Sequence, residues 1–279
     1  MPNTWNAKPD TTPITMKSIT FNDKKIFFAA SGKGKTIVLL HGFTETSKIW
    51  DSFREQLSES FRVIVIDLAG HGKSESLEPV HSMELQADVV YEVLKKRKVK
   101  KCLMIGHSMG GYVSLAFASK YPEMLKGLCL FHSHPFPDSA VDRKNRGRTI
   151  NIVEQDKFGF VAHFIPSLFP VGSRKKFGKE IKLLVKRAKE IPKEGIIAAL
   201  EGMKIRKNQT ALLKSINVPV LFILGLKDPK APIDRLWKMV SLPQRSECLI
   251  LRNVGHMGYI EAPEETLGMI RGFAKKVMK

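Results

Sequence analysis

Three residues of the chain have the types and the order that acyl-transfer chemistry requires: Ser108, Asp228 and His256. A serine hydroxyl is a weak nucleophile until a base accepts its proton, and an imidazole does this when an acid fixes its tautomer. We therefore expect Ser108 to be the nucleophile, His256 the general base and Asp228 the acid that orients it. Each follows a short apolar segment that reads as a strand, so all three are expected at the carboxyl edge of one parallel sheet.

The nucleophile candidate lies in a G-x-S-x-G pattern at residues 106–110. Because the pattern is short, its surroundings carry the argument: an apolar strand-like segment comes directly before it and a helical pattern follows. A tight turn there forces the serine into a strained backbone conformation. Gly106 and Gly110 have no side chains to clash across the turn, so the Ser108 hydroxyl should stand exposed above the sheet. A glycine-rich turn without chemistry is the alternative.

Asp234 is the alternative acid. It falls in the helical pattern 233–240, where a carboxylate in the first turn commonly stabilises the helix. Asp228 instead comes directly after a predicted strand, and the chain order of serine, aspartate and histidine favours it. Of the eight histidines, His256 has the loop position and order that the mechanism needs. The other histidines are expected to be structural.

Two backbone amides are predicted to stabilise the developing oxyanion, each worth roughly 10²–10³ in rate. Met109 supplies one, at the start of the helix that follows Ser108. Phe43 is expected to supply the other, from a loop after the predicted strand 36–40. Gly42 permits the close approach, and a plain glycine turn is the alternative.

Apolar segments rich in β-branched residues recur along the chain with helical patterns between them, which predicts an α/β fold. Continuous apolar segments are typical of parallel strands buried on both faces. The predicted parallel strands are Ile37 to Leu40, Val63 to Ile66, Cys102 to Ile105, Leu128 to Phe131, Val220 to Leu224 and Cys248 to Leu251. Before them, Ser18 to Phe21 and Lys25 to Ala30 predict an antiparallel hairpin, joined by Asn22-Asp23.

The alternation of strands and helices stops between residues 133 and 212, where helical patterns follow one another. We therefore predict a core of residues 1–132 and 213–279 and a helical cap, 133–212, inserted between the sixth and seventh strands. The cap is expected to cover the carboxyl edge of the sheet. Apolar cap residues, with Phe158, Phe164 and Phe169 as the site candidates, would line a substrate pocket. Packing within the cap is the equally weighted alternative.

The chain is strongly basic, with 46 Lys and Arg against 27 Asp and Glu, a formal charge of +19. The segment 133–212 holds 17 basic and 8 acidic residues. A solvated basic surface is the preferred explanation of this excess. The alternative is that it attracts an anionic small molecule or an acidic carrier protein as partner. The basic residues lack the aromatic interleaving typical of nucleic-acid binding, so no nucleic-acid partner is expected.

Other features of the composition suggest a cytoplasmic protein. No apolar run in the sequence approaches the roughly 20 residues that cross a bilayer. Residues 1–13 are polar and rich in proline, which gives no signal for export. The cysteines Cys102, Cys129 and Cys248 are odd in number and lie in apolar segments without metal-type spacing. They are expected to be reduced core residues, and no metal or cofactor is predicted.

Taken together, these segments resemble the α/β-hydrolase superfamily, in its small cap-bearing branch of serine esterases. The resembling segments are HGF at 41–43, DLAGHGKS at 67–74, GHSMGG at 106–111, GLKDPKAP at 225–232 and GHMGYIEAPE at 255–264. The resemblance implies a mostly parallel central sheet flanked by helices, with the Ser108, Asp228 and His256 triad at its edge. It assigns no catalytic role to Asp67 or His71. A serine at position 108 argues against haloalkane dehalogenases and epoxide hydrolases, which attack through a carboxylate.

The leading functional hypothesis is hydrolysis of a carboxylic ester or thioester through an acyl-enzyme on Ser108. A second hypothesis keeps the triad for C–C bond hydrolysis or for a cofactor-free lyase step of the menaquinone-pathway type, which the segment HGFTETSKIW at 41–50 favours mildly. The third is a binding protein that senses a small molecule with the same fold. A receptor needs neither a base nor an oxyanion loop, so the complete triad weighs against it. The acyl and alcohol groups stay open, because the pocket decides specificity in this fold.

Overall fold

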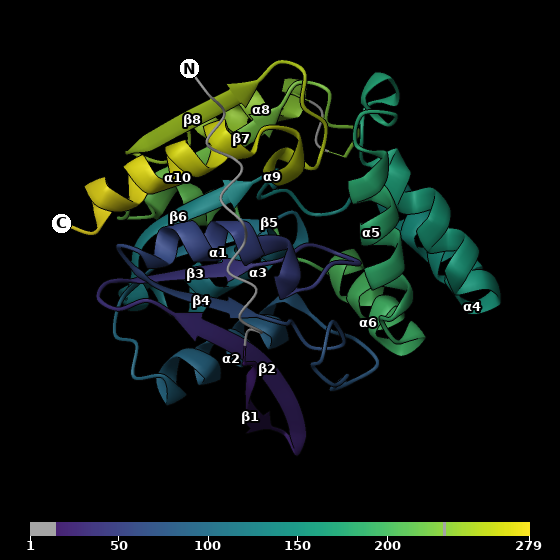
Figure 1. The fold of residues 1–279 in the computed structure, drawn as a ribbon, viewed down its shortest axis with the longest axis horizontal. Coiled ribbons are helices and arrows are strands. Elements are labelled where there is room, and N and C mark those ends of the chain that lie inside the picture. The colour runs from purple at the N-terminus through teal and green to yellow at the C-terminus, as the bar shows by residue number, and fades with distance from the viewer. Residues whose placement is uncertain (1–14, 231–232) are drawn as a thin grey trace.

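The computed structural model of the protein describes residues 15–230 and 233–279, the side chains of 233–235 excepted (Figure 1). Residues 1–13 and the side chain of Asp234 therefore lie outside the described part. The described strands form one eight-stranded sheet in the order β1-β2-β4-β3-β5-β6-β7-β8. The strands are β1 (Lys17–Phe21), β2 (Lys24–Ser31), β3 (Thr36–Leu40), β4 (Arg62–Ile66), β5 (Cys102–His107), β6 (Leu125–Phe131), β7 (Val220–Gly225) and β8 (Ser246–Leu251).

Six of these strands, β3 to β8, are parallel to one another. Every residue of β3, β5 and β7 is buried, as expected for strands that are covered on both faces. The last strand, β8, lies at the edge and is only partly buried. The expected α/β fold with a mostly parallel sheet is confirmed.

The predicted antiparallel hairpin is β1 and β2, at the opposite edge of the sheet. Asn22 and Asp23 both have positive φ angles, 46° and 60°. Two left-handed residues in a two-residue loop match the right-handed twist of the strands, which is why an Asn-Asp pair suits this turn. β2 then pairs antiparallel with β4 and joins the hairpin to the parallel strands.

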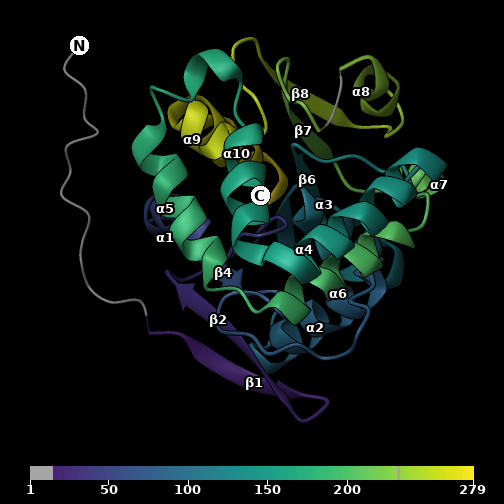
Figure 2. The ribbon, with the colours of Figure 1, turned by 90° about the vertical axis from the view of Figure 1, so that its right-hand side faces the viewer.

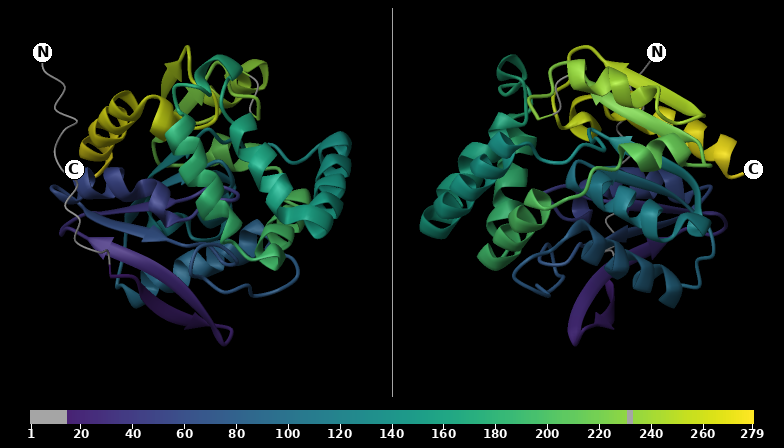
Figure 3. Two further views of the ribbon diagram at one scale, coloured as in Figure 1. Left: turned by 45° about the vertical axis from the view of Figure 1, so that its right-hand side comes forward. Right: turned by 180° about the vertical axis from the view of Figure 1, so that it is seen from behind.

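Helices cover both faces of the sheet (Figures 1 and 3). α1 (Asp51–Ser58) and α10 (Pro263–Val277) lie on one face, and α2 (Met83–Lys96), α3 (Met109–Lys120) and α8 (Ile233–Val240) lie on the other. Short helices complete the chain: η2 (Ser47–Trp50), η3 (Pro122–Met124), η4 (Val171–Ser173), α7 (Thr210–Ser215) and α9 (Gly258–Glu261). No helix in the described ranges is long and apolar enough to span a membrane.

Between β6 and β7 the chain forms three long helices that lie beside the sheet rather than on its faces, as Figure 1 shows, and Figure 2 shows them from the front. They are α4 (Ala140–Ser167), α5 (Gly178–Lys189) and α6 (Lys193–Lys204), and α4 packs against both of the others. We call α4, α5 and α6 the helical insertion. α4 begins with a capping box between Ser139 and Asp142 and is interrupted at Asp156, whose φ of −146° and ψ of 80° are not helical. The predicted boundary at residue 212 falls inside α7.

Candidate active site

The serine candidate occupies a sharp turn between β5 and α3. Ser108 has φ 50° and ψ −114°, a backbone conformation that residues with a side chain rarely adopt. A Cβ on Gly106 would lie 2.2 Å from the carbonyl oxygen of Gly110, and one on Gly110 would lie 2.5 Å from the Leu40 carbonyl oxygen. Both positions therefore require glycine, as the sequence predicts, because the turn closes against itself and against the end of β3.

Ser108, His256 and Asp228 meet at the carboxyl ends of β5, β8 and β7. The Ser108 Oγ lies 2.8 Å from His256 Nε2, and His256 Nδ1 lies 2.8 Å from Asp228 Oδ2 and 3.0 Å from Oδ1. His256 and Asp228 are 4% and 6% exposed, so little water competes for these hydrogen bonds. The His256 backbone amide also donates to the Leu168 carbonyl at 2.9 Å, which ties the histidine loop to the end of α4.

A second histidine contacts the same carboxylate. His132, which follows β6, places its Nδ1 3.1 Å from Asp228 Oδ2. Burial lowers the pKa of His132 to about 4, so the ring is neutral and its Nδ1 carries the proton that Asp228 accepts. Burial by itself raises the pKa of Asp228, but the charge of His256 and the hydrogen bonds from both histidines outweigh it and hold that pKa well below its usual range. Asp228 is therefore ionised and held from two sides.

The loop that carries Phe43 lies directly against the serine. A Cβ on Gly42 would be 3.2 Å from the Ser108 Cβ, so glycine allows this approach. Thr44 has a φ of 60° and makes the loop turn sharply. Met109 is the first residue of α3, where the backbone amide has no partner within the helix. Phe43 and Met109 are thus on the two segments that flank Ser108, where the predicted oxyanion donors are needed.

Sequence reasoning missed three buried polar residues beside Ser108: Glu45, His107 and His132. Glu45 and His107 contact each other, with Glu45 Oε2 2.9 Å from His107 Nδ1. A histidine next to the serine and a glutamate in the HGFTE segment were the available signals. Neither spacing nor periodicity shows that the two side chains meet, because Glu45 lies in the loop after β3 and His107 is the last residue of β5.

A cavity of about 450 Å³ opens above Ser108 and His256. Its apolar lining is Phe43, Phe160, Phe164, Leu168, Leu200 and Met203. Of the three predicted pocket residues, only Phe164 is in the lining, where its ring lies 5.6 Å from that of Phe43. Two of the predictions need correction. Phe158 is 55% exposed on the outer side of α4, and Phe169 is 1% exposed in the core, against Phe177.

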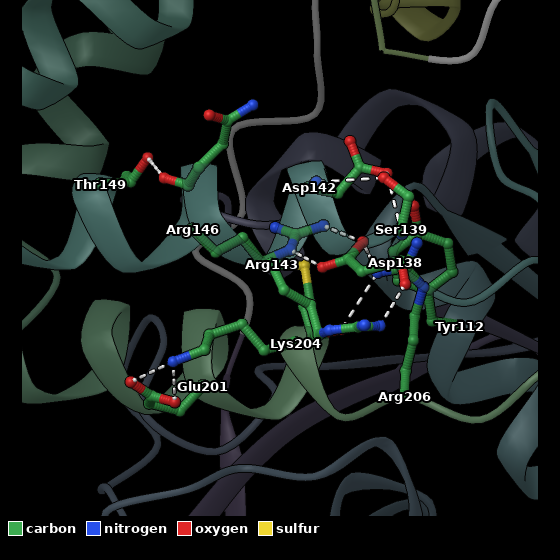
Figure 4. A network of polar contacts seen from close by, with 12 residues as sticks. Tyr112, Asp138, Ser139, Asp142, Arg143, Arg146, Thr149, Glu201, Lys204 and Arg206 are labelled. Carbon is green, nitrogen blue, oxygen red and sulfur yellow. Dashed lines mark hydrogen bonds and ion pairs between the residues drawn. The ribbon is translucent and has the colours of Figure 1, made fainter.

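The opposite part of the lining is polar and centres on the buried carboxylate of Asp138 (Figure 4). Asp138 accepts from Arg146 on α4 and from Arg206 just after α6. Arg143 donates to the Asp138 carbonyl at 2.7 Å, and the Arg206 guanidinium lies 4.3 Å from the Tyr112 ring centre. This network joins the two ends of the helical insertion to the core. Arg143 and Arg146, two arginines of the basic run 143–148, therefore have Asp138 as an internal partner.

Within the described residues, one group of side chains has the spacing of metal ligands: His132, Asp228 and His256, with ligand atoms within 4.8 Å of one another. These atoms are the ones already joined by the hydrogen bonds of the site. Their geometry is that of a carboxylate shared by two histidines, which suits proton transfer at His256.

Known proteins of one family match this chain. The family model described as alpha/beta hydrolase fold matches residues 35–168. An uncharacterized protein of Mycobacterium tuberculosis is 31% identical over 127 residues, which are 45% of this chain and 37% of that protein, so this chain spans little more than a third of it. A putative 2-succinyl-6-hydroxy-2,4-cyclohexadiene-1-carboxylate synthase of Bacillus subtilis is 30% identical, over 88% of this chain and 93% of that protein.

The solved structures agree. A thermophilic esterase from Thermogutta terrifontis has a TM-score of 0.90 and 31% identity, and the match covers 95% of this chain and all of the esterase chain. The similarity therefore extends over nearly the full length of both chains. This chain belongs to the α/β-hydrolase family, among relatives of the esterase type.

Proposed function

We propose that the protein hydrolyses a carboxylic ester or thioester through an acyl-enzyme on Ser108. The observation that carries this proposal is the continuous hydrogen-bond path from Ser108 Oγ through His256 to Asp228, at 2.8 Å for both steps, at the floor of a cavity. The esterase from Thermogutta terrifontis supports the reaction class.

In the proposed mechanism His256 Nε2 takes the Ser108 proton while Oγ attacks the substrate carbonyl carbon. The carbonyl oxygen becomes an oxyanion, which the Phe43 and Met109 amides stabilise. The bond to the alcohol or thiol breaks, and the leaving group takes the proton from His256. Water then repeats the sequence and releases the acid. Asp228 holds the histidine in the tautomer with Nδ1 protonated throughout.

We assign the acyl group to the apolar part of the cavity, with Phe160 and Phe164 of α4 as its walls. Residues 133–212 then act as a cap over the site. The carbonyl of Leu168 at the end of α4 fixes the His256 amide, so cap and base are joined directly. A small ester or thioester, with an anionic group or an acidic carrier attached, is the proposed partner. The thiols of Cys102, Cys129 and Cys248 are all free, which fits a reducing cytoplasm.

The Bacillus subtilis relative favours one second candidate, a lyase or C–C bond hydrolase that uses the same triad. In this second candidate function, Ser108 and His256 together remove a proton from the substrate. In the lyase case no acyl-serine accumulates. A sensing protein without turnover is the third candidate.

A fluorophosphonate probe tests the nucleophile first. It should label the wild type and not the Ser108→Ala variant, and equal labelling of both would reject Ser108. A series of p-nitrophenyl esters of rising chain length, run beside acyl thioesters, tests the reaction. We expect a burst of p-nitrophenol with one equivalent per site as the acyl-enzyme forms. Labelling of Ser108 without turnover of any ester or thioester would favour the lyase or the sensor.

A further inference from the structure

The Glu45 carboxylate is buried at the wall of the cavity and accepts hydrogen bonds from three separate segments. Oε2 accepts from the Gly42 amide at 2.6 Å and lies 2.9 Å from His107 Nδ1, and Oε1 accepts from the Tyr259 hydroxyl at 2.9 Å. Gly42 precedes Phe43, His107 precedes Ser108, and Tyr259 lies three residues after His256. One side chain therefore contacts the loop of each proposed catalytic group except Asp228.

The surroundings of His107 determine its charge. Its Nδ1 faces the Glu45 carboxylate and its Nε2 faces the backbone carbonyl oxygen of His256 at 2.9 Å. A carbonyl oxygen only accepts, so Nε2 carries a proton. The Gly42 amide can only donate, so Glu45 Oε2 already accepts one hydrogen bond. As part of a carboxylate, the same oxygen also accepts a hydrogen bond from His107 Nδ1. Protons on both ring nitrogens satisfy every group, which makes His107 an imidazolium and Glu45 a carboxylate.

The charges around the pair agree with this assignment. Burial lowers the pKa of His107, but the charge and hydrogen bond of Glu45, the hydrogen bond to the His256 carbonyl and the charge of Asp228 together outweigh it and raise that pKa above its ordinary value. Burial raises the pKa of Glu45, but the charge and hydrogen bond of His107, the hydrogen bond from the Gly42 amide and the charge of His41 together outweigh it and lower that pKa below its ordinary value. The other titratable groups facing the pair are His41 from the end of β3, His132 from β6, Asp228 from β7, and His256 and Tyr259 from the segment after β8.

We propose that Glu45 and His107 are positioning residues, a buried ion pair that holds the oxyanion loop and the His256 loop at fixed places on either side of Ser108. This inference rests on the proposed hydrolase function for its kinetic consequence only. His107 fixes the His256 backbone, and Glu45 fixes the Gly42 amide and through it the Phe43 amide. Neither side chain transfers a proton to the substrate.

The position of the pair explains why such a device is useful here. The three loops follow β3, β5 and β8, and β8 is separated from β5 by two strands in the sheet. Sheet hydrogen bonds fix the strands but not the loops beyond them. A misplacement of about 1 Å at a catalytic group costs about 10² in rate, so a single buried anchor shared by the three loops has a large kinetic effect.

Nuclear magnetic resonance of protein with 15N-labelled histidine tests the charge state without turnover. At pH 7.5 we expect protons on both ring nitrogens of His107, in the wild type and in Ser108→Ala alike, with the signal assigned by its loss in His107→Asn. Glu45→Gln should leave one ring proton. A single ring proton on His107 in the wild type would overturn the ion pair, whatever reaction the protein catalyses.

Kinetics on a neutral p-nitrophenyl ester tests the positioning role. We expect Glu45→Gln to lower kcat by about 10² with KM nearly unchanged, and Tyr259→Phe to lower it less. In a double-mutant cycle, Glu45→Gln with His107→Asn should cost less than the sum of the single variants. Glu92→Gln, on α2, is the matched control and should behave as the wild type, because the ion partner of Glu92 among the described residues is Lys95 on the same helix.

Several results would refute the positioning role: a wild-type kcat for Glu45→Gln, a loss confined to KM, or additive losses in the cycle. If Glu45→Gln did not fold, the proton count in the wild type and in Ser108→Ala would still decide the ion pair. If the wild type had no esterase activity, the proposed function would fail while a doubly protonated His107 would keep the ion pair.

Discussion

At the scale of single residues, Ser108 has a strained backbone and a hydrogen bond between its hydroxyl and His256. His256 in turn is hydrogen-bonded to the Asp228 carboxylate, which His132 also contacts. Strain at φ 50° costs stability of order 1–3 kcal/mol and persists where surrounding structure enforces it. Here β5, α3 and the end of β3 enforce it. The backbone thereby holds Ser108 Oγ within hydrogen-bond distance of His256 Nε2.

Ser108→Ala, His256→Ala and Asp228→Asn should each lower kcat by about 10⁴ and leave a folded protein, because triad members act as a unit. Steady-state kinetics with circular dichroism checks this. The double variant Ser108→Ala with His256→Ala should lose little more than either alone. Asp234→Asn is the control for the acid. If Asp234→Asn lost activity while Asp228→Asn kept it, the assignment of the acid would be wrong.

Dialysis against a chelator should leave esterase activity unchanged. The reason is that the imidazole and carboxylate atoms of His132, Asp228 and His256 with ligand spacing are engaged in hydrogen bonds with one another. The measurement is turnover before and after dialysis, with and without added zinc or manganese. Loss on dialysis with recovery on addition of either ion would replace the triad mechanism with a metal-dependent one.

At the scale of elements, the turn between β5 and α3 depends on a side chain being absent. Gly106→Ala places a Cβ 2.2 Å from the Gly110 carbonyl oxygen, so the strand and the helix must separate. We expect unfolding free energy to fall by about 1–3 kcal/mol, with lower kcat. Gly147→Ala in α4 meets no atom within 4 Å and should raise stability by about 0.5–1 kcal/mol. Urea unfolding showing the same change for both would contradict the steric argument.

Phe164 on α4 and Phe169, two residues after the end of α4, have different surroundings. Phe164→Ala should enlarge the cavity and shift the preferred acyl chain to a longer one, because its ring lines the cavity beside Phe43. Phe169→Ala should lower stability by about 3–5 kcal/mol with unchanged preference, because its ring is buried in the core. The p-nitrophenyl ester series measures both. A change of preference in the second variant alone would place the acyl group elsewhere.

At the scale of the whole molecule, the charge of +19 is the main feature that acts beyond the site. Arg143 and Arg146 are engaged by Asp138, so part of the basic run has an internal role. The remaining field acts through water and salt. For a carboxylated ester, kcat/KM should fall as salt is raised to about 0.5 M, while a neutral ester of equal length barely changes. Equal salt responses would leave the basic surface without a part in substrate choice.

The sequence by itself determined the features that depend on neighbours along the chain. Apolar runs predicted the parallel strands, Asn22-Asp23 predicted the hairpin, and glycine spacing around Ser108 predicted the tight turn, because each rests on local backbone geometry. Ser108, Asp228 and His256 each follow a predicted strand. The carboxyl ends of parallel strands lie at one edge of the sheet, so the sequence also predicted that the three residues lie at that edge.

Only the tertiary structure decided which side chains meet across loops and which face of α4 is turned inward. His132 contacts Asp228, and Glu45 contacts His107, through the spatial order of strands, which local spacing does not encode. Phe158 and Phe164 both follow the break in α4 at Asp156. At about 100° per residue, a spacing of six places their side chains on different faces of the helix. Phe158 is exposed to solvent and Phe164 lines the cavity, and only the packing of α4 over the site decides which of these two faces is turned inward.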